Sequence, residues 1–246
     1  MVINDREVVF KALVGSHNYN LNTETSDKDY KYFVLPTFED IYYNKTISKN
    51  VVSEDVDYTV HDIRKLPMLW WKTNINFVEP LFSREVMYNK NHIKWCEFIF
   101  SKANDFATMN LPYLYDACRG MSITKQKDMI KDSPARHENF EKYGYDPKSA
   151  CHAYRVLDFL DRMYLFDFDF KCSMWYGYRE YNYNVLMELK LGQYSLEDAQ
   201  KLIKCKEEDV AKLADIFHNK EPNEMVYDIL KNSVYSLVHS SIKRNM

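Results

Sequence analysis

A glycine and two aspartates near the N-terminus constrain the fold most strongly. Residues 8–14 and 30–35 are each rich in β-branched and aromatic side chains over a length typical of a strand. The segment between them opens with Gly15 and closes with Asp27 and Asp29. The sequence therefore predicts two strands joined by a helix, or at least by a tight loop with one helical turn.

The two aspartates suit a bound cation. On a strand, residues i and i+2 point to the same face about 6.5–7 Å apart, so Asp27 and Asp29 at a strand start would project side by side. Two like charges held together are unfavourable unless a cation lies between them, and Mg²⁺ prefers carboxylate and phosphate oxygens. The pair predicts a site for a Mg²⁺-bound nucleoside triphosphate. A polar surface loop in an unrelated α/β domain is the alternative.

Gly15 and Ser16 would hold the phosphates of such a ligand. A glycine directly after a strand lets the backbone turn sharply and approach a ligand, and the N–H groups of a helix that begins there form an anion site. The Ser16 hydroxyl adds a donor. A third carboxylate on a neighbouring strand would complete a two-metal site, which activates an attacking hydroxyl and stabilises the leaving pyrophosphate.

The remainder of the chain changes from strand-like to helical patterns. We expect a weak strand over residues 41–47 and another over 51–60, then a helix from Asp62 with Pro67 in its first turn. Residues 132–146 are polar and loop-like. Further helices are predicted at about residues 91–105, 113–131, 147–165, 195–217 and 223–243.

These patterns predict an α+β fold. Residues 1–90 would form a mixed sheet with flanking helices, and residues 91–246 a mostly helical region packed on that core. Asp146 and Ser195 are the expected N-caps of two of the helices, because their side chains can accept hydrogen bonds from free N–H groups.

Composition excludes several other classes of protein. The chain has 246 residues and a formal net charge of −3, so no global basic field indicates nucleic-acid binding. Its five cysteines include no C-x-x-C pair, which argues against a disulfide framework and a structural zinc site. No apolar run approaches the roughly 20 residues of a membrane span, and no signal-peptide pattern opens the sequence. We expect a cytoplasmic protein.

The stretch GSHNYNLNTETSDKDYKYFVL resembles the signature of nucleotidyltransferases of the DNA polymerase beta superfamily, most closely that of a bacterial and phage branch. Lys31 stands where that branch often has Arg. His17 and Asn18 replace its Arg-Ala, and Asn20 replaces a glycine; Asn tolerates left-handed conformations, so the turn can survive. The matching residues are Gly15, Ser16, Tyr19, Leu21, Thr23, Ser26, Asp27 and Asp29.

The resemblance extends over at least residues 8–160. The stretch DYTVHDIRKLPMLWWKTNINFVEPLF is similar to the branch's next block, and the segment from Cys118 to Gln126 falls where the branch has a helix. A second strong motif, YGYDxKxxxHxxR, includes Lys148, His152 and Arg155. At four- and three-residue spacing these three share one helix face. They would face the triphosphate or an acceptor, or else form an ordinary solvated surface.

The resemblance implies a third carboxylate on the strand predicted at 51–60. Asp57 is our choice, and Asp55, Asp62 and Glu79 are alternatives. Asp62 is equally suited to cap the helix that follows it. Asp27, Asp29 and Asp57 would then be the catalytic metal ligands, for two Mg²⁺ ions that Mn²⁺ can replace.

The implied activity is transfer of a nucleoside monophosphate from an NTP to a hydroxyl acceptor, such as an RNA 3′ end, a protein or a small molecule, with release of pyrophosphate. The alternative is a catalytically inactive nucleotide-binding regulator or partner-binding module of the same fold. The sequence gives neither the base, nor the acceptor, nor the oligomeric state. The residues expected to bind the nucleotide are Gly15, Ser16, His17, Ser26, Lys31, Lys148, His152 and Arg155.

Overall fold

The computed structural model describes residues 1–51 and 57–245. The chain divides into two compact units, one formed by residues 1–110 together with the segment from Pro222 to the C-terminus, the other by residues 111–221. The predicted end of a nucleotidyltransferase core near residue 90 stays a prediction, because a compact unit and a nucleotidyltransferase core need not end at the same residue.

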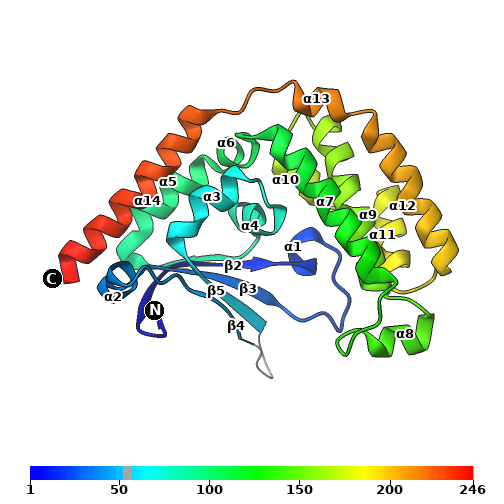
Figure 1. The fold of residues 1–246 in the computed structure, drawn as a ribbon, viewed down its shortest axis with the longest axis horizontal. Coiled ribbons are helices and arrows are strands. Elements are labelled where there is room, and N and C mark those ends of the chain that lie inside the picture. Colours follow the sequence, from blue (N-terminus) through cyan, green and yellow to red (C-terminus); the bar gives the residue numbers. More distant parts are fainter. Residues whose placement is uncertain (52–56, 246) are drawn as a thin grey trace. The chain divides into compact units, whose positions relative to one another are not determined.

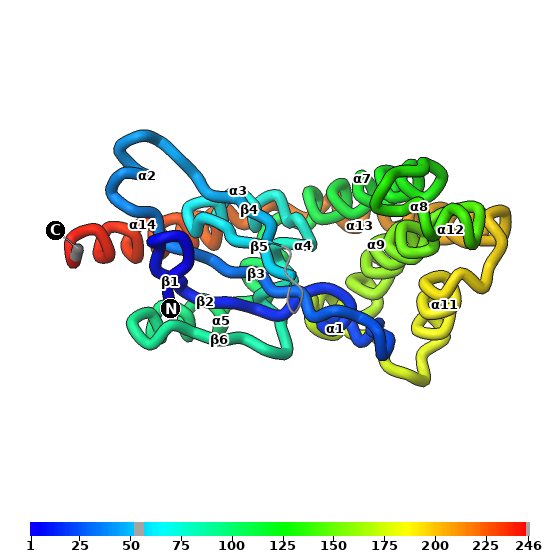
Figure 2. The backbone as a smooth tube through the Cα atoms, turned by 90° about the horizontal axis from the view of Figure 1, so that it is seen from below, coloured from blue at the N-terminus to red at the C-terminus, as the bar shows by residue number. Residues whose placement is uncertain are grey.

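The first unit is built on a mixed sheet of short strands. The strands lie in the order β1-β2-β3-β5-β4, and β6 pairs with the edge of β2 that faces away from β3 (Figure 2). β2 runs antiparallel to β3, β3 runs parallel to β5, and β4 runs antiparallel to β5. The strands are β1 (Val2–Ile3), β2 (Arg6–Val14), β3 (Asp29–Val34), β4 (Ser48–Val51), β5 (Asp57–Asp62) and β6 (Val86–Tyr88).

Several helices of this unit cover one face of the sheet, as Figure 1 shows for α3 to α6 and α14. Phe10 on β2 stacks on Phe33 of β3 with ring centroids 4.6 Å apart. Phe100 of α5 meets Phe10 edge-on at 5.4 Å, which fixes α5 against the sheet. The α-helices are α1 (Ser16–Tyr19), α2 (Phe38–Tyr42), α3 (Leu66–Trp71), α4 (Ile75–Val78), α5 (Ile93–Ser101), α6 (Ala103–Thr108) and α14 (Glu224–Asn245); the 3₁₀ turns are η1 (Ile63–Lys65), η2 (Glu79–Phe82) and η3 (Lys90–His92).

The second unit is helical throughout its regular elements and is organised around α9, most of whose side chains are buried. α7, α10, α11 and α12 pack on α9. Asp146 caps α9 by accepting from the N–H of Ser149, and Ser195 caps α12 by accepting from the N–H of Asp198, as predicted. The helices are α7 (Leu111–Met129), α8 (His137–Tyr143), α9 (Pro147–Leu165), α10 (Phe170–Met174), α11 (Tyr181–Lys190), α12 (Leu196–Ala211) and α13 (Ala214–His218).

The α+β prediction is confirmed, and α9 has the predicted bounds. The strand predicted over 41–47 is wrong, because the helix α2 runs into its first residues. Thr37 and Asp40 start this helix with a capping box, in which each side chain accepts from the other residue's backbone N–H. The strand predicted over 51–60 is confirmed for residues 57–60, which lie in β5, but Val51 belongs to β4, which runs antiparallel to β5. Residues 52–56 of this prediction lie outside the described residues. The predicted loop 132–146 contains α8.

Among the described residues, none of the helices is both long and apolar enough to cross a membrane.

Candidate active site

Gly15 makes a sharp turn between β2 and α1. Its torsion angles, φ 74° and ψ −151°, fall in a region that is essentially restricted to glycine. A Cβ at this position would lie 2.9 Å from Oδ2 of Asp29. The N–H of Gly15 donates to Oε1 of Glu79 at 3.1 Å. The turn is the one that the sequence predicts, and it brings the backbone against a carboxylate.

Asp29 and Asp57 lie opposite each other at the first residues of the parallel strands β3 and β5. Burial and the nearby charges of Asp57 and Asp27 raise the pKa of Asp29. Together with Gly15 and Lys31, the paired aspartates line a cavity of about 330 Å³. The strand register thus places two like charges in one recess, an arrangement that a cation would relieve.

Asp27 occupies a different environment from Asp29. It is exposed and precedes the first residue of β3. The alternation of side chains along a strand, on which the prediction of two adjacent aspartates depended, therefore does not apply to Asp27. Its charge is nonetheless close enough to contribute to the raised pKa of Asp29. Within residues 1–51 and 57–245, no three His, Cys, Asp or Glu side chains come together closely enough to hold a metal ion.

The alternatives for a third carboxylate differ in their burial and in their hydrogen-bond partners. Asp55 lies outside the described residues. Asp62 is buried, accepts from the N–H of Arg64 at 2.9 Å and pairs with the Arg64 guanidinium, so it fills the capping role that its position allowed. Glu79 is buried, accepts from Gly15 and lines the same cavity as Asp57. Asp57 and Glu79 therefore remain the candidates beside Asp29.

Lys31 is the cation of this cavity. Its ammonium group donates to the carbonyl oxygen of Asn76 and lies 5.1 Å from the ring centroid of Phe77. Burial lowers the pKa of Lys31 to about 8, although the carboxylate of Asp29 opposes the shift. The backbone of α4 thus holds the ammonium group, which makes no ion pair with the described residues. A phosphate oxygen that enters the cavity would meet this positive charge.

The residues that depart from the branch pattern each have a structural role. Nε2 of His17 lies 2.8 Å from the carbonyl oxygen of Ser26, which ties α1 to the loop that precedes β3. Oδ1 of the fully buried Asn18 accepts from the N–H of Arg84 at 3.0 Å. Asn20 ends α1 in the left-handed conformation, with φ 65° and ψ 33°. The substitution of Asn for Gly therefore keeps the turn, as predicted.

The two serines of the signature also belong to the loop's own hydrogen bonding. The carbonyl oxygen of Ser16 accepts from the N–H of Leu21. Oγ of Ser26 accepts from the N–H of Thr23 at 2.9 Å. These bonds hold the segment between β2 and β3 in shape, and the roles of both serines toward a nucleotide stay predictions.

The second motif lies in the helical unit, where Lys148 and His152 line a cavity of about 430 Å³. Arg155, one turn further along α9, is buried. Lys125 of α7 and Arg136, just before α8, line the same cavity. The sequence analysis missed these two, since only the folded arrangement of three helices brings them to the α9 motif.

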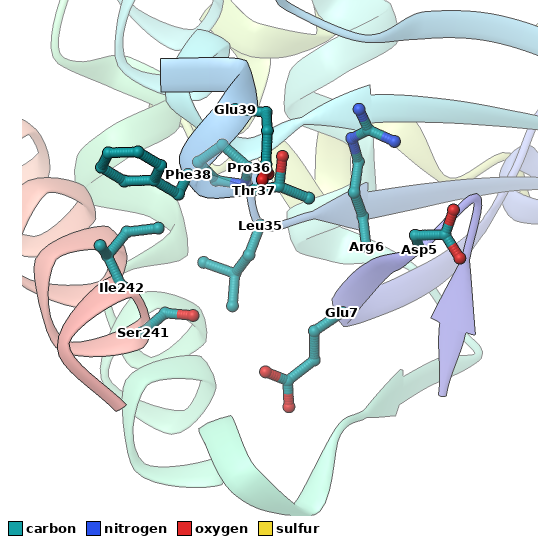
Figure 3. A pocket seen from close by; sticks show the side chains of 10 residues that line it. All are labelled: Asp5, Arg6, Glu7, Leu35, Pro36, Thr37, Phe38, Glu39, Ser241 and Ile242. Atoms are coloured by element: carbon teal, nitrogen blue, oxygen red, sulfur yellow. The ribbon is translucent and has the colours of Figure 1, made fainter. Parts of the chain in front are cut away.

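A further cavity lies at the opposite end of β2 and β3 from Gly15, where the start of β2, the connection to α2 and α14 meet (Figure 3). Two of the charged side chains that line it, Arg6 and Glu7, form ion pairs. Asp40 pairs with Arg6, whose hydrogen bond lowers the pKa of Asp40 to about 2. Glu7 accepts from Asn91 at 2.8 Å and pairs with Arg244. Arg6 and Glu7 of this cavity therefore have structural partners.

The Gly15 turn adjoins two aspartates at the starts of neighbouring strands, Asp29 and Asp57, as the resemblance to polymerase beta-type nucleotidyltransferases implied. The comparison with known families agrees. The sequence profile of RlaP, described as the RNA repair pathway DNA polymerase beta family, matches residues 3–160.

The chain therefore belongs to the RNA repair pathway DNA polymerase beta family. The match covers strands β2 to β6, the Gly15 turn, Asp29, Asp57 and the α9 motif. No curated protein matches the chain.

Proposed function

We propose that this protein transfers a nucleoside monophosphate from an NTP to the 3′ hydroxyl of an RNA, with release of pyrophosphate. The observation that carries the proposal is the pair Asp29 and Asp57, held opposite each other beside the Gly15 turn in one cavity. The family's description as part of an RNA repair pathway favours RNA among hydroxyl acceptors.

The donor set fits Mg²⁺. Mg²⁺ is usually bound by one or two carboxylates together with substrate phosphates and water, so Asp29 and Asp57 are sufficient protein ligands. The pKa of Asp29 is raised by burial and by the charges of Asp57 and Asp27, although Lys31 and His17 oppose the shift, so the acidic pair would still gain from a bound cation. Asp27 would join as a third ligand from its exposed position before β3.

When bound, Mg²⁺ supplies Lewis-acid stabilisation of the phosphoryl oxygens and promotes loss of the acceptor's hydroxyl proton. The chain's own residues orient the substrate. The Gly15 turn would lie beside the β and γ phosphates, since its lack of a side chain lets the backbone approach Asp29 closely. Lys31 would contact a phosphate oxygen and offset the charge that develops on the leaving group. His17, Ser16 and Ser26 would set the path of the loop around the triphosphate.

The test is incubation of the protein with each α-labelled NTP, Mg²⁺ and a short RNA that ends in a 3′ hydroxyl. The same RNA ending in a 3′ phosphate is the acceptor control. We expect label on the first RNA only, and loss of at least a thousandfold in rate for Asp29→Asn and for Asp57→Asn. Asp105→Asn, a change at an exposed aspartate of α6, should transfer at the rate of the unmodified protein. Equal rates for the Asp57→Asn and Asp105→Asn variants would refute the proposed roles.

A second candidate is a nucleotide-binding regulator without transferase activity. The exposed position of Asp27, and the lack of three converging metal-binding side chains in the described part of the chain, favour it. It predicts that the protein binds NTP but labels no RNA, protein or small hydroxyl compound with any of the four nucleotides.

A further inference from the structure

The connection from α10 to α11 presents two tyrosines and an arginine to solvent. It belongs to the stretch MWYGYREYNYN, residues 174–184, which lies beyond the residues 3–160 that the family profile matches. The exposed fractions of Tyr178 and Tyr181 are 70% and 75%, and Arg179 between them in the sequence is also exposed. Exposed apolar side chains that stand singly are ordinary, whereas a group of them marks an interaction site.

The backbone that carries these side chains is anchored by Arg162 of α9. Its guanidinium donates to the carbonyl oxygens of Ser173 at 2.8 Å and of Cys172 at 3.0 Å, and also to that of Trp175. The same guanidinium forms an ion pair with Glu180. Because Arg162 is itself buried, the connection is tied to the core of the helical unit at both of its ends. 

The residues between these anchors form a closed turn. The N–H of Glu180 donates to the carbonyl oxygen of Gly177 at 2.9 Å, and the N–H of Gly177 donates to Oε1 of Glu180 at 2.9 Å. Tyr178 and Arg179 are the two central residues of this turn. The ring of Tyr183, in the first turn of α11, meets the ring of Tyr178 edge-on with centroids 5.2 Å apart. The exposed ring of Tyr178 is therefore supported from one side.

The turn also carries an uncompensated positive charge. Arg179 makes no ion pair with any of the residues 1–51 and 57–245. Glu180, the acidic residue of the turn, is already engaged by Arg162 and by the N–H of Gly177. A free guanidinium beside exposed tyrosines is the chemistry that binds single-stranded nucleic acid, because bases stack on aromatic rings and phosphates pair with the cation.

We propose that Tyr178, Arg179 and Tyr181 bind single-stranded RNA, with the tyrosine rings stacked on bases and Arg179 in contact with a phosphate. The inference rests on the proposed function for the choice of RNA as the ligand, because the acceptor of that reaction is an RNA strand. Every base has a π face, so binding by stacking tolerates differences in sequence. The bases of a duplex are already stacked on one another, so a duplex should bind poorly.

The experiment measures the affinity of the whole protein for a short, fluorescently labelled single-stranded RNA by anisotropy, without NTP or divalent metal, so that transfer does not contribute. The unmodified protein should bind this RNA, and bind the same RNA annealed to its complement about tenfold more weakly or worse. Tyr178→Leu should weaken the affinity about tenfold, as should Tyr181→Leu, whereas Tyr178→Phe keeps the ring and should change it less than about twofold. Tyr235→Leu, at a tyrosine of α14 with a similar exposed fraction of 67%, is the matched control and should leave the affinity unchanged.

The salt dependence of the same binding tests the charge contact. Arg179→Gln should weaken the affinity and reduce the slope of log affinity against log salt concentration by about 0.7, the value for one phosphate contact on a single strand. Lys201→Gln, at an exposed lysine of α12, should leave the slope unchanged. Equal slopes in the Arg179→Gln and Lys201→Gln variants would overturn the role of Arg179.

Equal affinities of the Tyr178→Leu and Tyr178→Phe variants, or of single strand and duplex, would overturn the inference. A changed oligomeric state of Tyr178→Leu with unchanged RNA affinity would also overturn it, because the surface would then be a contact between copies of this chain. Thermal melting checks the fold of each variant, and Tyr181→Leu decides the matter if Tyr178→Leu unfolds.

The inference and the proposed function fail in different ways. Transfer of label to RNA by a protein whose RNA affinity does not depend on Tyr178 would refute this inference and leave the proposed function standing. RNA binding through Tyr178 without transfer of label to any acceptor would refute the proposed function and leave this inference standing.

Discussion

Two clusters of charge, one in each unit, are built on opposite electrostatic principles. In the helical unit the fully buried Asp158 pairs with Lys206 at 2.9 Å and accepts from Asn182, while Asp161 pairs with the same ammonium group at 3.1 Å. In the strand unit Asp29 and Asp57 face each other, and among the described residues neither of them makes an ion pair.

The difference separates a structural cluster from a candidate catalytic one. Charges that stabilise a fold are paired, because a buried unpaired charge is costly. Charges that bind a cation and a phosphorylated substrate have to stay unpaired until the ligand arrives, so they destabilise the free protein. The Asp158 cluster follows the first rule, and the Asp29–Asp57 pair follows the second.

The largest expected effect is on the compensated cluster. Lys206→Met leaves Asp158 buried without its partner, and should lower the free energy of unfolding by about 3–5 kcal/mol, measured by urea denaturation. Lys212→Met removes a lysine that pairs with Asp209 at the surface and should leave stability nearly unchanged, because exposed ion pairs contribute little. Similar losses in the two variants would mean that the buried cluster is not a stabilising one.

The Gly15 turn should be nearly as sensitive. Gly15→Ala forces alanine into a glycine-only conformation, which costs about 1–3 kcal/mol, and places its Cβ against Asp29. Gly120 lies within α7 with open space around it, so Gly120→Ala should be neutral or stabilise by up to about 1 kcal/mol. Denaturant titration of both variants checks the contrast, and a harmless Gly15→Ala would remove the argument for a close backbone approach.

The charge of Lys31 should make both stability and NTP binding depend on pH. Its pKa in the fold is about 8 against 10.5 for the free side chain, so the cost of burying the charged lysine is present below pH 8 and disappears as pH rises toward 10.5. The same loss of charge should weaken NTP binding up to about tenfold per pH unit above 8. Fluorescence titration with a non-hydrolysable NTP from pH 7 to 9.5 measures this.

Lys31→Arg should bind with little pH dependence over that range, because guanidinium stays charged. Lys49→Arg, at an exposed lysine of β4, should keep the pH dependence of the unmodified protein. If Lys31→Arg retains that dependence too, Lys31 is not the titrating contact.

The smallest effect is on the two ends of β5. Asp57→Asn removes a like charge opposite Asp29 and should raise the free energy of unfolding by about 0.2–1 kcal/mol. Asp62→Ala removes a capping side chain that pairs with Arg64 and should lower it by about 1 kcal/mol. Thermal melting of both variants measures this. A change of stability in the same direction at positions 57 and 62 would contradict the distinction between a ligand-binding and a structural aspartate.

The sequence was sufficient for the parts of the fold that depend on local chemistry. Asp146, Ser195 and Asn20 have the conformations that their side chains favour. The capping box of Thr37 and Asp40 is also a local signal, and it decides the structure against the strand propensity of the apolar residues that follow.

Features set by pairing between distant segments could not be read in the same way. The register of β3 against β5 decides that Asp57 faces Asp29, and no local pattern fixes that register. Lys125 and Arg136 reach the cavity of Lys148 only after three helices have packed. Asp27 lies outside the strand because β3 begins at Asp29, whereas the spacing of the two aspartates indicated a strand that includes both.

The central claim is that Asp29 and Asp57 together hold a divalent cation with an NTP, and its most direct test is Mn²⁺ binding measured by electron paramagnetic resonance in the presence of a non-hydrolysable NTP. We expect the unmodified protein and Asp105→Asn to bind Mn²⁺–nucleotide with the same affinity, and Asp57→Asn and Asp29→Asn to bind it at least tenfold more weakly. Unchanged binding in both the Asp57→Asn and Asp29→Asn variants would contradict the claim.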